Sequence, residues 1–208
     1  DTRGLPRFVD QPGIGADGGE GAGIVDLGAV ELAQFSFPVE VTTTADTVDP
    51  TDGEISLREA IAFANDPAAG LAGDGDADGD GEAADTITFT EDVFGGGATI
   101  ALTNGELEIT APVAIDGDAD GDGIGDVTVD AGGQSRIFDV PEFTAETTLS
   151  GLALTGGYTS GSGEVGGAVR SQAPLTILGS TFTDNATAGS FSPGGAVFAG
   201  STGTVTIS

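Results

Sequence analysis

Short runs of alternating apolar and polar residues, separated by Gly, Asn and Asp, dominate the chain from about residue 35 onward. Every second residue from Phe35 to Val41 is apolar, which is typical of a half-buried β-strand. Pro38 lies inside this run and favours an edge position or the start of a strand. Very short strands are then predicted at 86–89, 99–102, 107–109, 113–115, 127–129, 137–140, 149–154, 168–169, 175–177, 182, 196–197 and 205–207.

One helix is predicted, and it begins at Ser56. Ser56 and Glu59 have the spacing of a capping box, in which each side chain bonds the backbone of the other residue. The residues at 57, 60, 61 and 64 form one apolar stripe. Asn65 and Pro67 end the helix. A single short amphipathic helix in a β-rich chain is best placed as a lid over an exposed end of the core.

The last third of the chain repeats internally. Residues 166–169 (Gly-Gly-Ala-Val) recur 28 residues later at 194–197, and residues 175–177 recur 30 residues later at 205–207. Several short strands in each repeat of this length indicate an all-β solenoid whose coils stack on one another. Both ends of such a tube need covers. The helix at 56–65 would cover the N-terminal end, whereas the C-terminal end at Ser208 stops in mid-pattern and is expected to meet a neighbouring domain, more chain or another subunit.

Composition sets limits on fold and function. The chain has 208 residues, 37 of them Gly, and 38% are apolar, which is too apolar for disorder and too glycine-rich for a helical bundle. The formal charge is −29, with 34 acidic residues against five Arg and no Lys. This balance excludes nucleic-acid binding, which requires cationic side chains. No apolar run approaches the roughly 18 residues of a membrane span, and Cys is absent. Because the chain starts at Asp1, we expect a processed product or a piece of a longer chain.

Two stretches of alternating acidic and small residues are predicted to bind Ca²⁺, at 74–85 and 116–126. Carboxylates at this density repel one another unless a cation lies among them, and a hard divalent cation prefers oxygen ligands. The alternative is a flexible, solvated acidic linker. The predicted ligands are Asp74, Asp76, Asp78, Asp80, Glu82, Asp85, Asp116, Asp118, Asp120, Asp122 and Asp126.

The spacing within the two stretches supports calcium. The upstream acids and Gly79 fall at the ligand and glycine positions of an EF-hand-type loop, although Asp85 replaces the usual closing Glu. The downstream loop has two possible registers, one starting at Asp116 and one at Asp118. The second register resembles the calcium repeats of thrombospondin type 3. Because the downstream loop lies between two predicted strands, we expect it to be an insertion that calcium rigidifies.

Residues 55–65, Ile-Ser-Leu-Arg-Glu-Ala-Ile-Ala-Phe-Ala-Asn, resemble the CSLREA domain family, with Ile55 in place of Cys. The segments 85–89, 115–117, 136–140 and 151–157 are also similar to features of that family. The Gly-Gly-Ala-Val repeats and residues 182–185 resemble repeats of polymorphic outer membrane proteins. The resemblance covers about residues 35–208 and implies a right-handed parallel β-helix with an N-terminal capping helix.

Residues 1–34 resemble a different part of such proteins, the closing segment at the C-terminal end of a β-helix. Here this segment comes first. The order implies a tandem array, or a filament in which residues 1–34 of one subunit complete the open end of its neighbour.

The sequence offers little for catalysis. A lyase of the pectate type would need a basic residue beside the calcium carboxylates, yet Lys and His are absent, and of the five Arg only Arg170 lies outside a structural-looking motif. A hydrolase needs a pair of carboxylates with separated pKa values, and the sequence marks none. Asn185 begins a glycosylation sequon, but an Asn stacked in a solenoid turn is the favoured interpretation.

These observations predict a secreted or cell-surface structural or adhesive segment, calcium-stabilised, as part of a fibre, matrix or adhesin stalk. The expected partners are neighbouring copies or adjacent repeats stacked on the open end, and an extracellular polysaccharide is a further candidate. The alternative function is a carbohydrate-binding or polysaccharide-cleaving β-helix.

Overall fold

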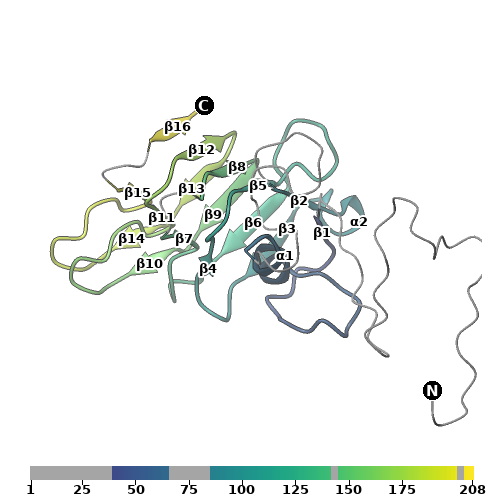
Figure 1. The fold of residues 1–208 in the computed structure, drawn as a ribbon, viewed down its shortest axis with the longest axis horizontal. Coiled ribbons are helices and arrows are strands. Elements are labelled where there is room, and N and C mark those ends of the chain that lie inside the picture. Colours follow the sequence, from purple (N-terminus) through teal and green to yellow (C-terminus); the bar gives the residue numbers. More distant parts are fainter. Residues whose placement is uncertain (1–38, 66–84, 142–144, 201–203) are drawn as a thin grey trace, which may run out of the picture. The chain divides into compact units, whose positions relative to one another are not determined.

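The computed structural model describes residues 39–65, 85–141, 145–200 and 204–208. Within these residues the strands are short and parallel, and they stack as a β-solenoid of about four turns (Figure 1). The predicted all-β, right-handed parallel β-helix with a short N-terminal capping helix is therefore confirmed.

Three sheets form the walls of the solenoid. A fourth, smaller sheet is formed by strands that follow those of the second sheet and precede those of the third along the chain. The first sheet contains β1 (Val39–Val41), β2 (Asp85–Phe89), β5 (Val113–Asp116), β8 (Thr147–Ser150), β12 (Leu175–Leu178) and β16 (Val205–Ile207). The second contains β3 (Ala98–Ala101), β6 (Val127–Asp130), β9 (Leu152–Thr155) and β13 (Thr181–Thr183). The third contains β4 (Leu107–Glu108), β7 (Phe138–Val140), β11 (Val169–Ser171) and β15 (Val197–Ala199). The two-stranded sheet pairs β10 (Tyr158–Thr159) with β14 (Ala186–Thr187).

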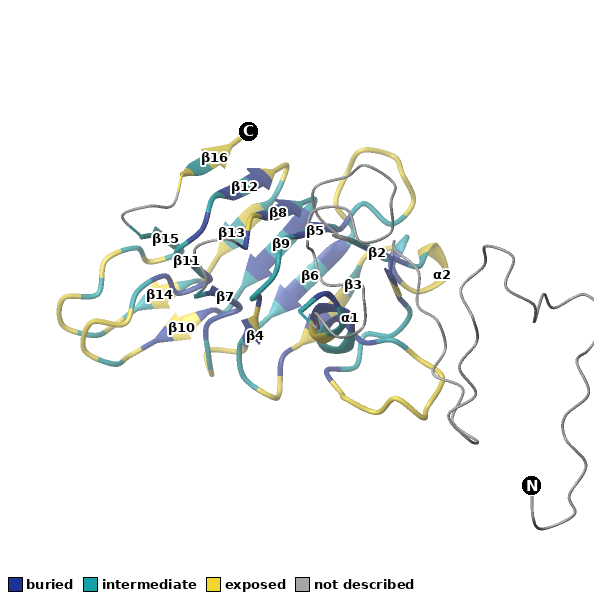
Figure 2. Cartoon of the chain, in the orientation of Figure 1, coloured by how far each residue is buried: buried dark blue, intermediate teal, exposed yellow. Residues whose placement is uncertain are grey.

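Equivalent apolar residues of successive coils line up inside the solenoid. In the first sheet the register places Ile115, Leu149 and Ile177 at the same position of neighbouring strands. All three side chains are fully buried. Figure 2 draws the buried residues of β5, β8 and β12 in dark blue. Burying one such side chain contributes about 1.5–3 kcal/mol, so these ladders are the main stabilising element of the fold.

The predicted capping helix is α1 (Leu57–Ala64), and the capping box is present as expected. The predicted apolar stripe is buried and belongs to the core of the solenoid. At its C-terminal end, the side chain of Asn65 donates to Glu108 O (2.8 Å) and accepts from Thr110 N (2.8 Å). The helix is therefore fixed to the first coil by polar contacts as well as by its apolar face.

Two local predictions need correction. A second helix, α2 (Glu91–Phe94), follows β2 and buries Phe94 against Phe89 in an edge-to-face contact with ring centroids 5.0 Å apart. Its four residues are too few to show helical periodicity in the sequence. The predicted single strand at 149–154 is instead the end of β8 and most of β9, because Gly151 turns the chain with a φ of 61°.

Several predictions lie outside the described residues. These are the closing segment at 1–34, the start of the first strand at 35–38 and residues 74–84 of the upstream acidic loop. Neither helix of the described chain is long and apolar enough to cross a membrane.

Candidate functional site

The downstream aspartate loop leaves the solenoid at the corner between the first and second sheets. It connects β5 to β6, as predicted, and its two ends meet at a closed neck. At the neck, the backbone N–H of Asp126 donates to Gly117 O (2.8 Å), and Gly117 N donates to Ser150 O of the next coil (2.8 Å). The loop is therefore an insertion in a regular coil, not a linker between domains.

Three glycines make this neck possible. A Cβ added to Gly117 would lie 2.5 Å from Gly151 O, and a Cβ added to Gly125 would overlap the same oxygen. Gly151 itself has positive φ and turns the coil below. Any larger residue at positions 117 or 125 would push the loop away from the corner on which it rests.

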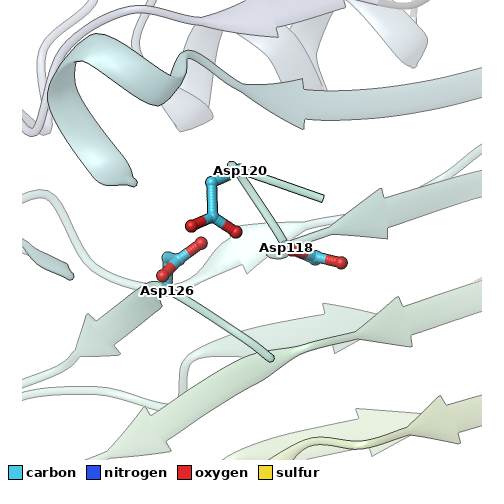
Figure 3. A group of neighbouring side chains, drawn as sticks. All are labelled: Asp118, Asp120 and Asp126. Carbon is cyan, nitrogen blue, oxygen red and sulfur yellow. The ribbon is translucent and has the colours of Figure 1, made fainter. Parts of the chain in front are cut away.

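Three of the predicted calcium ligands converge within the loop. Asp118, Asp120 and Asp126 each offer a carboxylate oxygen, and these atoms lie within 4.8 Å of one another (Figure 3). Asp126 is held at the neck and Asp118 is partly buried just inside it, whereas Asp120 is exposed. The loop lies close to the C-terminal end of α2, because a Cβ added to its C-cap, Gly95, would lie 3.5 Å from Asp120 Cβ.

The other two described candidates lie outside this group, and like its members they accept hydrogen bonds from the loop backbone. Asp116 Oδ1 accepts from Asp118 N (3.3 Å), and Asp122 Oδ1 accepts from Ile124 N (2.8 Å). The group of three therefore matches neither register in full, since Asp116 and Asp122 are both outside it. Asp74, Asp76, Asp78, Asp80 and Glu82 lie outside the described residues, and of Asp85 only the backbone at the start of β2 is described.

One carboxylate oxygen in this group lacks a partner. Asp118 Oδ2 accepts from Gly123 N (2.9 Å), but Asp118 Oδ1 is inaccessible to solvent and accepts no hydrogen bond from the described residues. A buried carboxylate oxygen is costly unless a donor or a cation lies beside it. This atom is one of two such buried polar atoms in the described chain; the other is Thr159 Oγ1.

A second set of ionic contacts joins the capping helix to the first coil. Arg58 donates from Nε and Nη2 to both oxygens of Asp46 (2.7 and 3.1 Å) and from Nη1 to Glu106 O (3.0 Å). Asp46 also accepts from the backbone N–H groups of Thr103 and Asn104. Burial opposes ionisation of Asp46, but these hydrogen bonds and the charge of Arg58 outweigh it, so the pKa is lowered.

A third set lies on the outer face of the third sheet, where Asp139 and Arg170 are neighbours in register. Arg170 donates from Nε and Nη2 to the two carboxylate oxygens of Asp139 (2.5 and 2.6 Å). Arg136 pairs with Glu106 (2.6 Å) and approaches Asp139 (3.7 Å). Burial raises the pKa of Glu106, and Asp139 and Glu108 add to this, whereas Arg136 and Arg170 oppose it. A polar groove of about 490 Å³ is lined by Glu106, Arg136, Asp139 and Arg170, among other residues.

The pairs of Asp46 with Arg58 and of Asp139 with Arg170 were not predicted from the sequence. The second pair could have been found by aligning 138–140 with 169–171 as equivalent strands, which places Asp139 beside Arg170. No comparable signal marks Asp46, because its partner lies 12 residues away across an irregular turn.

Asn185 stacks in a turn of the solenoid, as predicted from the sequence. Its side chain accepts from Gly157 N (2.7 Å) and donates to Leu154 O (2.8 Å), so it stacks one coil on the preceding one.

Comparison of the chain with protein-family models, with curated proteins and with solved structures finds no match.

Proposed function

We propose that this chain is a calcium-stabilised structural segment of an extracellular or cell-surface assembly, such as a fibre, matrix or adhesin stalk. The observation that carries the proposal is the apolar face of the last described coil. On that face, inward residues that pack on the core are left half covered. A further coil, from an adjacent repeat or a neighbouring copy, would cover them.

Comparison of successive coils supports this partner. Phe182, Val197 and Val205 are half-buried, whereas the residues paired with them one coil earlier, Leu154, Val169 and Leu175, are fully buried. Ile207 is 68% exposed, whereas its partner Ile177 is 0% exposed. Within the described residues β13, β15 and β16 each pair on one side only. Unpaired strand edges with apolar side chains favour addition of further strands.

The proposed calcium site is the group of Asp118, Asp120 and Asp126. Its support is the spacing of the acids, the convergence of three carboxylates and the unpartnered oxygen of Asp118. Calcium binding there would offset the mutual repulsion of the carboxylates and fix the loop against α2. Sites of this kind in extracellular modules have Kd values on the order of 10⁻⁴–10⁻³ M, which extracellular calcium fills.

Association in solution tests the structural role. We expect the chain to associate with rising concentration in millimolar calcium, as measured by analytical ultracentrifugation and electron microscopy. Ile207→Asp should weaken association because it places a charge on the apolar face. Val48→Asp is a matched control, since Val48 is similarly exposed (66%) but lies before α1. A strictly monomeric wild-type species, or association that Ile207→Asp leaves unchanged, would contradict the proposal.

Thermal melting tests the calcium site. Adding EGTA should lower the Tm of the wild-type chain by roughly 2–5 °C. Asp120→Asn combined with Asp126→Asn should reduce this shift, whereas Asp92→Asn, an exposed acid of α2, should leave it unchanged. Magnesium at the same ionic strength separates specific binding from screening. No effect of EGTA on the wild-type Tm would refute the calcium site.

A further inference from the structure

A polar groove lies over the outer face of the third sheet, away from the aspartate loop. Its floor contains Arg136, Asp139 and Arg170, and one wall is the segment 158–164, which includes β10. Glu106, which directly precedes β4 in the chain, also lines the groove. Its volume of about 490 Å³ is within the range of small-ligand sites, but such sites are mostly apolar whereas this one is lined almost entirely by polar side chains.

The carboxylates in the groove already have partners. Asp139 is buried and bonds to Arg170 through both oxygens, and Glu106 pairs with Arg136. Glu164 accepts from the backbone N–H of Gly161 (2.8 Å) in its own turn. The groove therefore contains no carboxylate pair free to act on a bond, and we expect binding without cleavage.

Several hydrogen-bonding groups of the groove remain available to a ligand. Arg170 is 32% exposed in its side chain and uses Nε and Nη2 on Asp139, which leaves Nη1 without a partner among the described residues. Tyr158 is 37% exposed, and its hydroxyl has no partner in the described part of the chain. A partly exposed aromatic ring beside free polar groups offers both a stacking surface and hydrogen bonds.

Charge limits the class of ligand. Three carboxylates against two guanidinium groups give the groove no positive excess, and the chain carries a formal charge of −29. Polyanions such as uronate polymers or nucleic acids are therefore disfavoured. Apolar ligands are disfavoured by the polar walls, because they would leave those groups without hydrogen bonds.

A neutral ligand rich in hydroxyl groups fits these constraints. We propose that the groove binds a unit of a neutral polysaccharide, with the sugar ring against Tyr158 and a sugar hydroxyl accepting from Arg170 Nη1. This site goes beyond the structural role proposed above and depends on neither calcium nor association. It would let a stacked assembly attach to glycans along its length.

Binding of neutral oligosaccharides tests the site. The probes are gluco-, manno- and xylo-oligosaccharides, with oligogalacturonate as the anionic comparison, titrated into the full 208-residue chain by calorimetry. We expect at least one neutral series to bind and oligogalacturonate to bind more weakly. Tyr158→Ala should weaken binding by about tenfold, and Tyr158→Phe by less, because the ring is retained.

Phe191→Ala is the matched control. Phe191 is an aromatic residue, 93% exposed, that does not line the groove, so its loss should leave binding unchanged. Circular dichroism and Tm establish that each variant is folded. Failure of all three neutral series to bind would overturn the proposal. So would tighter binding of oligogalacturonate, or wild-type affinity in Tyr158→Ala. Release of reducing ends during the titration would overturn the assignment of a groove that binds without cleaving.

Discussion

Arg58 shows how one side chain connects segments that are far apart in the sequence. It holds Asp46 on the chain before α1 and, through Gly105 O and Glu106 O, the turn before β4. Asp46 in turn accepts from two backbone N–H groups of that turn. The side chain of Asp46 is 1% exposed, so this carboxylate depends on its partners for stabilisation.

Asp46→Asn tests the ion pair of Asp46 with Arg58. At neutral pH we expect the free energy of unfolding to fall by about 3 kcal/mol, because Arg58 loses its buried partner. The folded pKa of Asp46 is lowered, so its contribution is present above the unfolded pKa of about 4 and is lost as pH falls through the folded pKa. Urea denaturation across this pH range should therefore show the difference between wild type and variant shrinking with acidity.

The control for this measurement is Asp92→Asn on α2, an exposed position where we expect a change of less than about 0.5 kcal/mol. Equal stability of Asp46→Asn and wild type at neutral pH would show that this ion pair contributes nothing to the free energy of unfolding.

Residue-scale prediction from sequence worked where a local rule applied. The capping box of Ser56 and Glu59 and the buried stripe of α1 follow from spacing alone, and both are present. The prediction that the downstream aspartate loop is an insertion between two strands is confirmed. Which of its aspartates converge depends on loop backbone geometry, because all five accept hydrogen bonds from nearby N–H groups and only three of them bring a carboxylate oxygen together. The partner of Arg170 depends on the stacking register, which a single strand does not contain, and the partner of Arg58 depends on an irregular turn.

At the scale of elements, the corner between the first and second sheets is the place where the coils differ most. Successive coils carry α2, then the aspartate loop, then Gly151 alone. The core ladders on either side keep their register across these differences. Sequence periodicity found the strands because the ladders are regular, but it merged β8 with β9 because a one-residue corner leaves no polar gap.

Gly125→Ala tests how closely the loop rests on this corner. The added Cβ would overlap Gly151 O, so we expect a loss of about 2–3 kcal/mol in the free energy of unfolding, measured by urea denaturation. Gly96→Ala is the control, because a Cβ there meets nothing within 4 Å and the residue has no positive φ. A Gly125 variant as stable as the Gly96 variant would mean that the loop does not pack on the corner in solution.

At the scale of the whole molecule, charge dominates. Apolar ladders stabilise the coils, while a formal charge of −29 on 208 residues opposes compaction through self-repulsion. The described cations are committed to local contacts, since Arg58, Arg136 and Arg170 all pair with acids. Most of the negative charge must therefore be screened by solvent ions.

Salt should stabilise this chain markedly. Raising sodium chloride from low to high concentration in the presence of EGTA should increase Tm by roughly 5–10 °C, because screening weakens the repulsion between carboxylates. Differential scanning calorimetry measures this, and the EGTA ensures that calcium is not the cause. A Tm that is constant or falls over the series would show that self-repulsion does not limit stability.

The closed neck between Gly117 and Asp126 has a consequence for how such a chain can vary. Because the two ends of the loop bond to each other, the length of the loop does not affect the pairing of β5 with β8 or of β6 with β9. The loop at this corner can thus be replaced by loops of other length and sequence while the spacing between coils stays the same. The solenoid provides a scaffold on which loops of different chemistry can evolve, or be grafted, independently of the core.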